Sequence, residues 1–318
     1  MNMGAQLGTT RSHTVTSRDL WADSIHDLQE RICAELEAID GKAKFVEDTW
    51  QREEGGGGRT RVISSGNVFE KGGVNTSVVF GKVSDVMRTQ LKIEGDEWWA
   101  CGLSLVLHPI NPFVPTVHCN YRMFEVKNKN HEEEERAWFG GGADLTPYYL
   151  FEEDATHFHK TYKGVCDAFD PSFYSTFKRD CDDYFVNTHR SNERRGVGGI
   201  FYDHQKPDPK HDIDFWMKFG KACGNAFVSA YRPIVQKRRS MPYTNKHRHW
   251  QEIRRGRYVE FNLIHDRGTL FGLKTNGRIE SILMSLPPTV RFEYNYVPEP
   301  GSEEDKLLQV CLHPREWV

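Results

Sequence analysis

Two consecutive segments in which polar and apolar residues alternate constrain the fold of this chain more than any other feature. From Gly102 to Val126, one set of alternate positions carries Ser104, His108, His118, Asn120 and Arg122. The intervening positions of the first segment are Leu103, Leu105 and Leu107. Because alternate residues of a β-strand point to the same side of a sheet, we predict two strands with one packed face and one polar face.

The polar face has two interpretations. Antiparallel sheets often expose one face to water, and such a face collects polar residues that do no chemistry. An ordinary solvent-exposed face is rich in Lys, Glu and Thr, whereas two His, an Asn, a Ser and an Arg suit directional hydrogen bonding. The pattern therefore favours a functional site over a merely hydrated surface.

Composition limits the class of protein and its partners. The chain has 318 residues, of which 38% are hydrophobic and 12% aromatic, enough for a large core. A formal net charge of −3 gives no field for binding nucleic acid or an anionic membrane. Seven cysteines without a Cys-x-x-Cys pair indicate buried thiols in a reducing compartment, so we predict a cytoplasmic location. No apolar run approaches the roughly 18 residues that a membrane span needs.

The N-terminal segment differs from the rest of the chain. Residues 1–18 include Arg11 and Arg18, many Ser and Thr, and no acidic residue, which faintly resembles a transit peptide. The segment is short and lacks an apolar face, so we favour a disordered cytoplasmic leader. Without an internal repeat or a Pro- or Ser-rich linker, residues 19–318 are predicted to form a single domain.

Three helices are predicted from the spacing of apolar residues. The first begins at Ser17 and ends near Gly41. The second follows Asp170 and Pro171 and carries His189 and Arg190 in its last turn. The third runs from about residue 214 to residue 236 and contains Pro233.

The remaining segments are predicted as strands joined by short connections, which implies a largely antiparallel sheet. The predicted strands cover residues 62–69, 75–80, 200–203, 258–264, 270–274 and 279–286. Residues 53–61 are predicted to form a flexible loop, and residues 132–135 a solvated turn. Residues 266–268 and 276–277 are predicted as turns between the C-terminal strands.

The glycine-rich stretch Trp138–Pro147 is the most specific motif. Its three consecutive glycines, residues 140–142, cost backbone entropy, let the backbone pass close to a large flat object and are followed by the carboxylate of Asp144. A phosphate-binding loop is the alternative, but the stretch lacks the following Lys and the strand-to-helix order of such loops.

Histidines and arginines add two further possibilities. His108, His118, His157, His159 and His189 offer imidazoles for a divalent metal, although their spacing matches no compact ligand signature. Arginines lie beside turns or on polar strand positions and suit a substrate with several carboxylates, whereas any single one fits surface salt bridging equally well. This set comprises Arg122, Arg194, Arg195, Arg267 and Arg278.

Four long motifs together resemble one family. They are Ser104–Val126, Trp138–Pro147, Gly198–Asp203 and Tyr258–Pro287. Over roughly residues 20–318 the chain resembles oxygen-dependent coproporphyrinogen III oxidase. The resemblance implies an enzyme of haem biosynthesis that uses O2 to convert two propionates of coproporphyrinogen III into vinyl groups. The products are protoporphyrinogen IX, CO2 and H2O2.

The same resemblance implies the fold and the assembly. The expected fold class is α+β, with a large, mostly antiparallel β-sheet and α-helices packed on both faces. The expected assembly is a homodimer whose contacts fall on Tyr258–Leu286. No nucleic acid and no membrane span are expected.

The resemblance also assigns site residues. The catalytic set is His118, as proton donor, with Asp144 and Asp266, carboxylates suited to accepting pyrrole N–H bonds. The substrate contacts fall on Ser104, Asn120, Tyr121, Arg122, Arg267, Asn276, Gly277 and Arg278. Bacterial members carry a divalent metal on four histidines, which here are His108, His118, His159 and His189.

Other members of the family need no metal or organic cofactor. We therefore expect O2 as co-substrate and no required cofactor, with a divalent metal left open. Two alternatives remain at this point: a tetrapyrrole-binding carrier without turnover, and a metal oxygenase with histidine ligands.

Overall fold

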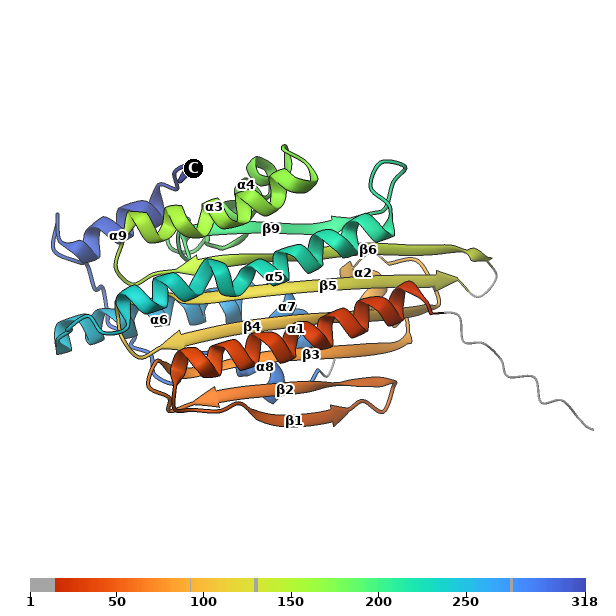
Figure 1. Cartoon of the computed structure of the whole chain (residues 1–318), viewed down its shortest axis with the longest axis horizontal. Helices are drawn as coiled ribbons and strands as arrows, with labels where there is room; N and C mark the ends of the chain where they lie inside the picture. Colours follow the sequence, from red (N-terminus) through yellow and green to blue (C-terminus); the bar gives the residue numbers. More distant parts are fainter. Residues whose placement is uncertain (1–14, 92, 129–130, 275–276) are drawn as a thin grey trace, which may run out of the picture.

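A seven-stranded antiparallel sheet forms the centre of the molecule (Figure 1). The computed structural model describes residues 15–91, 93–128, 131–274 and 277–318. Every neighbouring pair of strands in the sheet is antiparallel, as predicted. In spatial order the strands are β1 (Val46–Gln51), β2 (Gly56–Ser64), β3 (Phe69–Lys82), β4 (Glu97–Pro109), β5 (Thr116–Asn128), β6 (His131–Thr146) and β9 (Gly198–Gln205).

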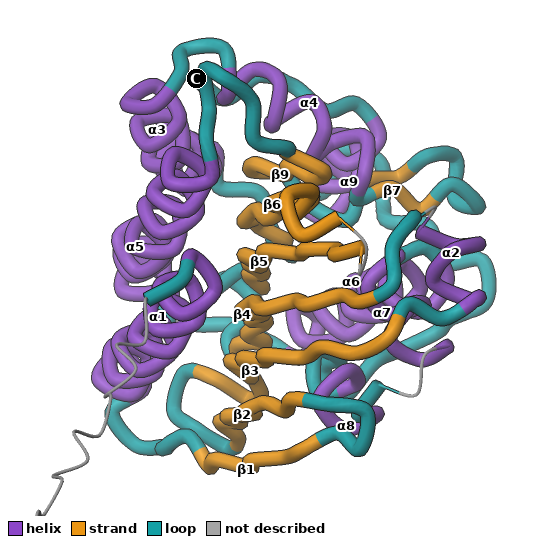
Figure 2. The backbone as a smooth tube through the Cα atoms, turned by 90° about the vertical axis from the view of Figure 1, so that its right-hand side faces the viewer, coloured by secondary structure: helices purple, strands orange, loops and turns teal. Residues whose placement is uncertain are grey.

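Helices cover both faces of this sheet, which confirms the predicted α+β class (Figure 2). One face packs against α1 (Ser17–Asp40), α3 (Glu152–Phe169) and α5 (Ile213–Arg238). The opposite side carries α2 (Asp85–Leu91), α6 (Asn245–Ile264), α7 (Arg267–Lys274) and α8 (Ile279–Leu283). Beside β9 lies α4 (Phe173–Tyr184), and α9 (Glu303–Leu312) lies on the same side of the sheet. The short strand β7 (Val186–Asn187) pairs with β8 (Glu193–Arg194) in a separate two-stranded sheet.

Helix α1 shows how sequence signals set the element boundaries. Thr16 and Asp19 form a capping box at its start, and Gly41 at its end adopts φ +75° in the left-handed region. Trp21, Ile25 and Leu28 lie on its buried face. The predicted start at Ser17 and end near Gly41 are both confirmed.

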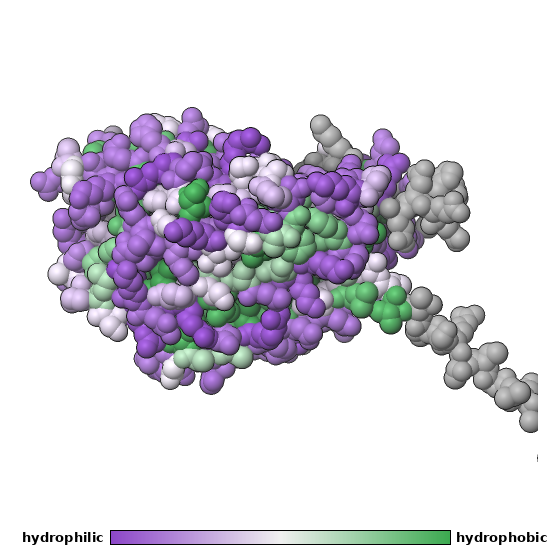
Figure 3. Space-filling view, turned by 45° about the horizontal axis from the view of Figure 1, so that its top comes forward, coloured by the Kyte–Doolittle hydropathy of each residue, from purple (hydrophilic) through white to green (hydrophobic). Residues whose placement is uncertain are grey.

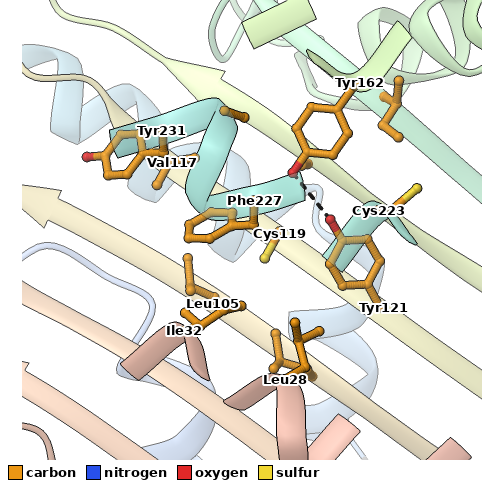
Figure 4. Close-up of a cluster of buried hydrophobic side chains, with 14 of the residues drawn as sticks. Leu28, Ile32, Leu105, Val117, Cys119, Tyr121, Tyr162, Cys223, Phe227 and Tyr231 are labelled. Atoms are coloured by element: carbon orange, nitrogen blue, oxygen red, sulfur yellow. Dashed lines mark hydrogen bonds between the residues drawn. The ribbon is translucent and has the colours of Figure 1, made fainter. Parts of the chain in front are cut away.

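The main core lies between the sheet and helices α1, α3 and α5 (Figure 4). Leu28 and Ile32 of α1 and Phe227 of α5 meet Leu105 of β4 and Cys119 of β5. Complete burial of an apolar side chain of this size contributes about 1.5–3 kcal/mol. The apolar alternate positions of β4 and β5 therefore anchor one face of the sheet, so that the opposite face is held in a fixed orientation.

The outer surface on the side of α1, α3 and α5 is mostly hydrophilic. Figure 3 shows this side with the top of Figure 1 brought forward, and smaller hydrophobic patches lie among the hydrophilic residues. The seven cysteines, all within the described residues, are buried and free, in agreement with the predicted buried thiols. In the described part of the chain, no helix combines the length and apolar character that a membrane crossing requires.

Two predicted loops are strands. Residues 56–61 belong to β2, where a Cβ on Gly58 would lie 2.5 Å from the ring of Trp50 on the neighbouring strand. These glycines therefore allow close strand packing and do not mark a flexible loop. Residues 132–135 belong to β6, whose hairpin with β5 pairs Asn128 with His131 and Val126 with Arg136. Backbone pairing in that hairpin outweighs the charge pattern that favoured a turn.

Three predicted C-terminal strands are helices. The segments 258–264, 270–274 and 279–286 fall mainly on α6, α7 and α8. The apolar repeat of α6 already begins with Trp250 and Ile253 and continues through Phe261, so a strand interpretation that starts at residue 258 misses its helical period. Asp266 opens α7 as a helix cap and does not form a hairpin turn.

Two predicted boundaries are also wrong. Helix α4 ends at Tyr184, because Phe185 leaves the helical conformation at φ −85° and ψ 58°. His189 and Arg190 therefore follow β7 and are not in the last turn of this helix. Helix α1 begins inside the predicted leader 1–18, of which residues 1–14 lie outside the described residues. The single-domain assignment of residues 19–318 stays a prediction.

Candidate active site

The strand register brings the predicted polar residues onto one face of the sheet. Ser104 of β4 pairs with Asn120 of β5, and His118 of β5 pairs with Asp144 of β6. Directly paired residues of antiparallel strands share a face. We call this the site face; it carries Ser104, His118, Asn120, Arg122 and Asp144, and it is the face directed away from the main core. The alternation predicted for residues 102–126 is therefore confirmed.

At one end of the site face, a histidine, an aspartate and an arginine form a connected group. The Nδ1 atom of His118 lies 2.7 Å from Oδ1 of Asp144. Arg195 donates from Nη2 to both carboxylate oxygens of Asp144, at 3.0 and 2.8 Å. The side chains of Asp144 and Arg195 are each 3% exposed, whereas that of His118 is 19% exposed. His118 is therefore the member of this group that a bound molecule can reach.

The electrostatics of this group favour an ionised carboxylate. Burial alone would raise the pKa of Asp144, but the charge of Arg195 and the hydrogen bond with His118 outweigh it and lower the pKa below its ordinary value. With Asp144 ionised, the proton of the shared hydrogen bond belongs on Nδ1 of His118. The other ring nitrogen, Nε2, is then available to exchange a proton with a ligand.

Aromatic rings surround the Arg195 guanidinium. Its carbon lies 4.2 Å from the ring centre of Phe185, 4.5 Å from that of Tyr258 and 5.0 Å from that of Phe261. Nη1 donates to Asn262 of α6 at 2.9 Å. These contacts exclude water from the ion pair and fix the plane of the guanidinium. Arg195 belongs to the arginine set noted in the sequence, but the resemblance assigned it no role.

A second group offers accessible positive charge on the same face. Arg122 donates to Asn120 at 2.8 Å and lies 2.7 Å from Oδ1 of Asp203 in β9. Arg267, at the start of α7, reaches the other carboxylate oxygen of Asp203 at 3.2 Å. The side chains of Arg122 and Arg267 are 35% and 59% exposed. Both guanidinium groups therefore keep surface for a carboxylate ligand.

Asp203 was not among the site residues predicted from the sequence. The charge of Arg122 outweighs the effect of burial and lowers the pKa of this carboxyl, so it is ionised and links the two arginines. The sequence did contain a signal for Asp203. It is the last residue of the Gly198–Asp203 motif, and it lies two positions after Phe201 in the strand, so both side chains point to the same face. The motif alone did not reveal its partners, which come from β5 and α7.

The glycine run has a local structural reason. A Cβ on Gly140 would lie 2.7 Å from Nη2 of Arg122, so this glycine gives the guanidinium room to lie over β6. A Cβ on Gly141 would lie 2.8 Å from the hydroxyl of Tyr202. The run thus positions Arg122 as well as presenting Asp144.

A row of stacked aromatic rings crosses four strands beside Arg122. Trp98 stacks on Phe124 with ring centres 5.7 Å apart, and Phe124 stacks on Trp138 at 4.4 Å. Trp138 in turn lies 5.8 Å from His204. Phe271 of α7 packs, like Trp98, Phe124 and Trp138, against a small buried cluster that includes Met87 of α2 and Val126 of β5. The site face therefore combines a flat apolar region with cationic groups.

The remaining predicted residues divide into two groups. Asp266 accepts from the hydroxyl of Tyr184 at 2.8 Å and from the backbone of Thr269 at 2.7 Å, so it caps α7 next to Arg267. Arg278 instead pairs with Asp48 of β1, at the edge of the sheet opposite β9. Gly277 donates its backbone N–H to Gly272 of α7, and Asn276 lies outside the described residues. The structure thus brings Asp266, but not Arg278, close to the Arg267 end of the site.

Tyr121 lies on the wrong face for the predicted substrate contact. Its side chain is fully buried, and its hydroxyl lies 3.4 Å from that of Tyr162 in the main core (Figure 4). The physical reason is the strand period, which points residue 121 away from its neighbours Asn120 and Arg122. The Tyr121 side chain is therefore not part of the site face.

The four histidines named for a metal have separate partners. His108 contacts the Thr116 hydroxyl at 3.1 Å and the Ser285 carbonyl at 2.7 Å. His159 of α3 contacts Tyr174 at 2.9 Å and the Val197 carbonyl at 3.0 Å. His189 contacts His265 at 2.8 Å and Glu260 at 3.1 Å.

These histidines therefore do not fit a four-histidine metal site within one chain. His118 is bonded to Asp144 on the site face, whereas His159 lies on α3 behind the opposite face. In the part of the chain that the structure describes, no group of three or more His, Cys, Asp and Glu residues could hold a metal ion. We assign no step to a metal.

Together, the accessible guanidinium groups and the His118–Asp144 pair form a site of the kind that suits a small anionic molecule with several carboxylates and proton exchange with it. The sequence model of the family described as coproporphyrinogen III oxidase matches residues 21–317. The chain belongs to the coproporphyrinogen III oxidase family.

Curated relatives carry the same name. The chain is 50% identical to coproporphyrinogen-III oxidase 1, chloroplastic, of Arabidopsis thaliana, over 98% of this chain and 82% of the relative. It is 49% identical to the oxygen-dependent coproporphyrinogen-III oxidase, chloroplastic, of Glycine max, with the same coverage. The corresponding protein of Nicotiana tabacum is 48% identical over 100% of this chain and 81% of the relative.

Proposed function

We propose that this chain is an oxygen-dependent coproporphyrinogen III oxidase of haem biosynthesis. The observation that carries the proposal is the His118–Asp144 pair beside the accessible Arg122 on one sheet face. The names of three relatives that are 48–50% identical over nearly the whole chain support the same activity.

In this proposal the arginines choose which propionate reacts. Arg122 and Arg267 each present a guanidinium fork that matches a carboxylate, and Asp203 holds the two forks together before the substrate binds. The row of Trp98, Phe124 and Trp138 offers the flat apolar surface that a tetrapyrrole covers. Such positioning brings one propionate to the reacting position and keeps the others away.

The acid–base pair moves the proton. Both oxygens of Asp144 are already engaged by His118 and Arg195, and the carboxylate is almost completely buried. Asp144 therefore acts through His118, whose Nε2 exchanges a proton with the substrate. This geometry differs from the predicted direct contact of Asp144 with the pyrrole N–H groups.

The balance of each step requires only O2 as the oxidant. A propionate loses CO2 and a hydride equivalent and becomes a vinyl group. The hydride equivalent and a proton reduce O2 to H2O2. Two such steps convert the two propionates. The electron-rich substrate supplies the electrons itself, so we propose that no metal or organic cofactor is required.

The cofactor proposal has a separate test. The protein should keep its activity after exhaustive dialysis against a chelator, with no stoichiometric metal found by elemental analysis. Loss of activity on chelation and its recovery on addition of one divalent metal would contradict this proposal.

A homodimer is the second part of the proposal. Within the predicted interface, Leu263, Ile264 and Ile279 are exposed apolar residues on α6 and α8. A symmetric partner would cover these side chains. Phe261 is unsuitable as an interface residue because it is fully buried against Phe185.

The cellular location stays a prediction. The names of the three relatives include the word chloroplastic, whereas the sequence favoured a cytoplasmic protein. A fluorescent protein fused behind residues 1–18 would distinguish the two locations in cells of the source organism. Organelle fluorescence would contradict the cytoplasmic assignment.

The catalytic proposal is tested by steady-state kinetics with coproporphyrinogen III under air. The wild type should form protoporphyrinogen IX, and Arg122→Ala should lower kcat/KM by about a hundredfold, since it removes a charge-assisted contact. Arg179→Ala is the matched control, because Arg179 is exposed on α4. Wild-type kinetics in Arg122→Ala would remove this arginine from the site, and substrate binding without turnover by the wild type would indicate a carrier.

A further inference from the structure

Arg195 is almost completely buried and comes from the turn between β8 and β9. Its backbone N–H donates to the carbonyl of Phe185 at 2.8 Å, and its side chain enters the space between α6 and the site face. The guanidinium contacts three aromatic rings, Asn262 and Asp144, and it is 3% exposed. The substrate cannot reach a group in this position without a rearrangement of these rings.

The contacts of Arg195 fix the orientation of Asp144. The guanidinium is planar, and Asn262 holds its Nη1, so Nη2 is fixed where it donates to both Oδ1 and Oδ2 and keeps the carboxylate in a defined position. Oδ1 is also the atom that meets Nδ1 of His118. The orientation of the imidazole therefore depends on that of the guanidinium through a shared oxygen.

We propose that Arg195 is a positioning residue for the proposed reaction: it holds Asp144 so that His118 keeps its proton on Nδ1 and presents Nε2 to the substrate. Arg195 acts through Asp144 and does not itself touch the substrate. This inference rests on the proposed function for its kinetic consequence, whereas its consequence for His118 is independent of that function.

Arg195→Lys separates positioning from simple charge compensation. Lysine keeps the positive charge beside Asp144, but its single nitrogen cannot bond Asn262 and Asp144 through two nitrogens of one rigid plane, as the guanidinium does. We expect kcat to fall between about tenfold and a hundredfold, as for other groups that orient a catalytic residue, while KM changes less than about twofold. Arg194→Lys is the control, because the Arg194 side chain contacts the carbonyls of Asn192 and Leu312 instead of Asp144.

A second measurement observes His118 directly. Proton NMR with nitrogen-labelled histidine should show a hydrogen-bonded Nδ1–H of His118 in the wild type. The signal should weaken or disappear in Arg195→Lys and remain in Arg194→Lys. His118→Gln identifies the resonance. The signal requires no substrate, so it tests the inference even if the chain does not oxidise coproporphyrinogen.

The kinetic and NMR results together decide whether Arg195 has the positioning role. Reduced kcat with a nearly unchanged KM, together with loss of the Nδ1–H signal, supports the positioning role. A wild-type kcat in Arg195→Lys, or an unchanged Nδ1–H signal, overturns it. A raised KM with an unchanged kcat also overturns it, because that result indicates direct substrate binding. Arg195→Met, which removes the charge as well, should lower kcat further; a kcat above that of Arg195→Lys would contradict the role.

Discussion

Buried charge at single residues determines what the site face can do. Asp144 and Arg195 are both removed from water. Replacing either residue leaves the other as a buried charge without a counter-charge. Breaking a buried ion pair from one side usually costs about 3–5 kcal/mol. Arg122 and Arg267 are more exposed, so water can compensate the charge of their partner when either arginine is replaced.

Replacement of Asp144 tests this distinction. Asp144→Asn keeps the shape but removes the negative charge that orients His118, so we expect kcat to fall by about a hundredfold or more. The free energy of unfolding should fall by about 3 kcal/mol, because Arg195 then lacks its counter-charge. Steady-state kinetics and chemical denaturation measure the two effects, with Asp23→Asn on the surface of α1 as control. Normal kinetics in Asp144→Asn would refute the role of this carboxylate.

Two buried histidines predict how stability depends on pH. Burial and the charge of Arg255 lower the pKa of His108 to about 3, and burial lowers that of His159 to about 4. Both are therefore neutral in the folded protein at pH values where the unfolded chain binds a proton. Their stabilisation is complete above the unfolded pKa of 6.5 and is lost as the pH falls toward the folded values.

At about pH 5, this linkage should lower the free energy of unfolding by about 2 kcal/mol for each of the two histidines. Chemical denaturation gives the free energy of unfolding of the wild type and of His108→Gln near pH 7 and near pH 5. The loss of stability between these two pH values should be smaller in His108→Gln, and the difference is the contribution of His108. His313→Gln, at an exposed position, is the control. An identical loss of stability in His108→Gln and the wild type would show that His108 does not contribute.

Among helices and strands, the type of element is predicted well where the segment contains the full repeat of polar and apolar residues that is typical of that element. Residues 102–126 alternate over two paired strands, so the packed face and the site face follow directly from the sequence. Residues 258–264 cover less than two helical turns of α6, and their β-branched and aromatic residues favoured a strand. The capping box at Thr244 and His247 was the signal that placed the helix start earlier.

The candidate site likewise contains residues that the sequence pattern predicts and residues that it does not. His118, Asn120, Arg122 and Asp144 are brought together by strand register, which the alternation predicts. Arg195 and Asp203 acquire their partners through tertiary packing of β9, α6 and α7, which no local pattern contains. Tyr121 illustrates the limit of motif transfer, because neighbours in a strand motif point to opposite faces.

Helix α8 depends on a glycine of β3. The thioether of Met284, which follows α8, occupies the place that a Cβ of Gly73 would take. Gly73→Val should displace α8 and lower the free energy of unfolding by about 1–3 kcal/mol, as expected for overpacking. Gly164→Ala is the control, because this exposed helical glycine has open space and alanine should stabilise α3 by about 0.5–1 kcal/mol. Wild-type stability in Gly73→Val would show that α8 is not held at this position.

For the whole molecule, the central question is how the apolar side chains outside the core are covered. Core residues between the sheet and α1, α3 and α5 are buried within one chain. Leu263 and Ile264, at the end of α6, are instead exposed and adjacent to the elements that carry Arg267 and Asp266. A partner subunit at this position would stabilise α7 and, through it, the cationic end of the site.

A charge at this surface should separate the proposed dimer. Ile264→Glu places a carboxylate where the symmetric contact would be, and we expect a monomer in analytical ultracentrifugation with a folded circular dichroism spectrum. Val46→Glu, on the exposed edge strand β1, is the control. A stable Ile264→Glu dimer would place the interface elsewhere, and a monomeric wild type would contradict the assembly itself.

The stoichiometry of a complete reaction with coproporphyrinogen III under limiting O2 tests the proposed oxidative decarboxylation most directly. Each molecule of protoporphyrinogen IX should be accompanied by two molecules of CO2, two of consumed O2 and two of H2O2. The reaction should stop when O2 is removed. Turnover without O2, or O2 consumption without release of CO2, would contradict the proposed oxidative decarboxylation.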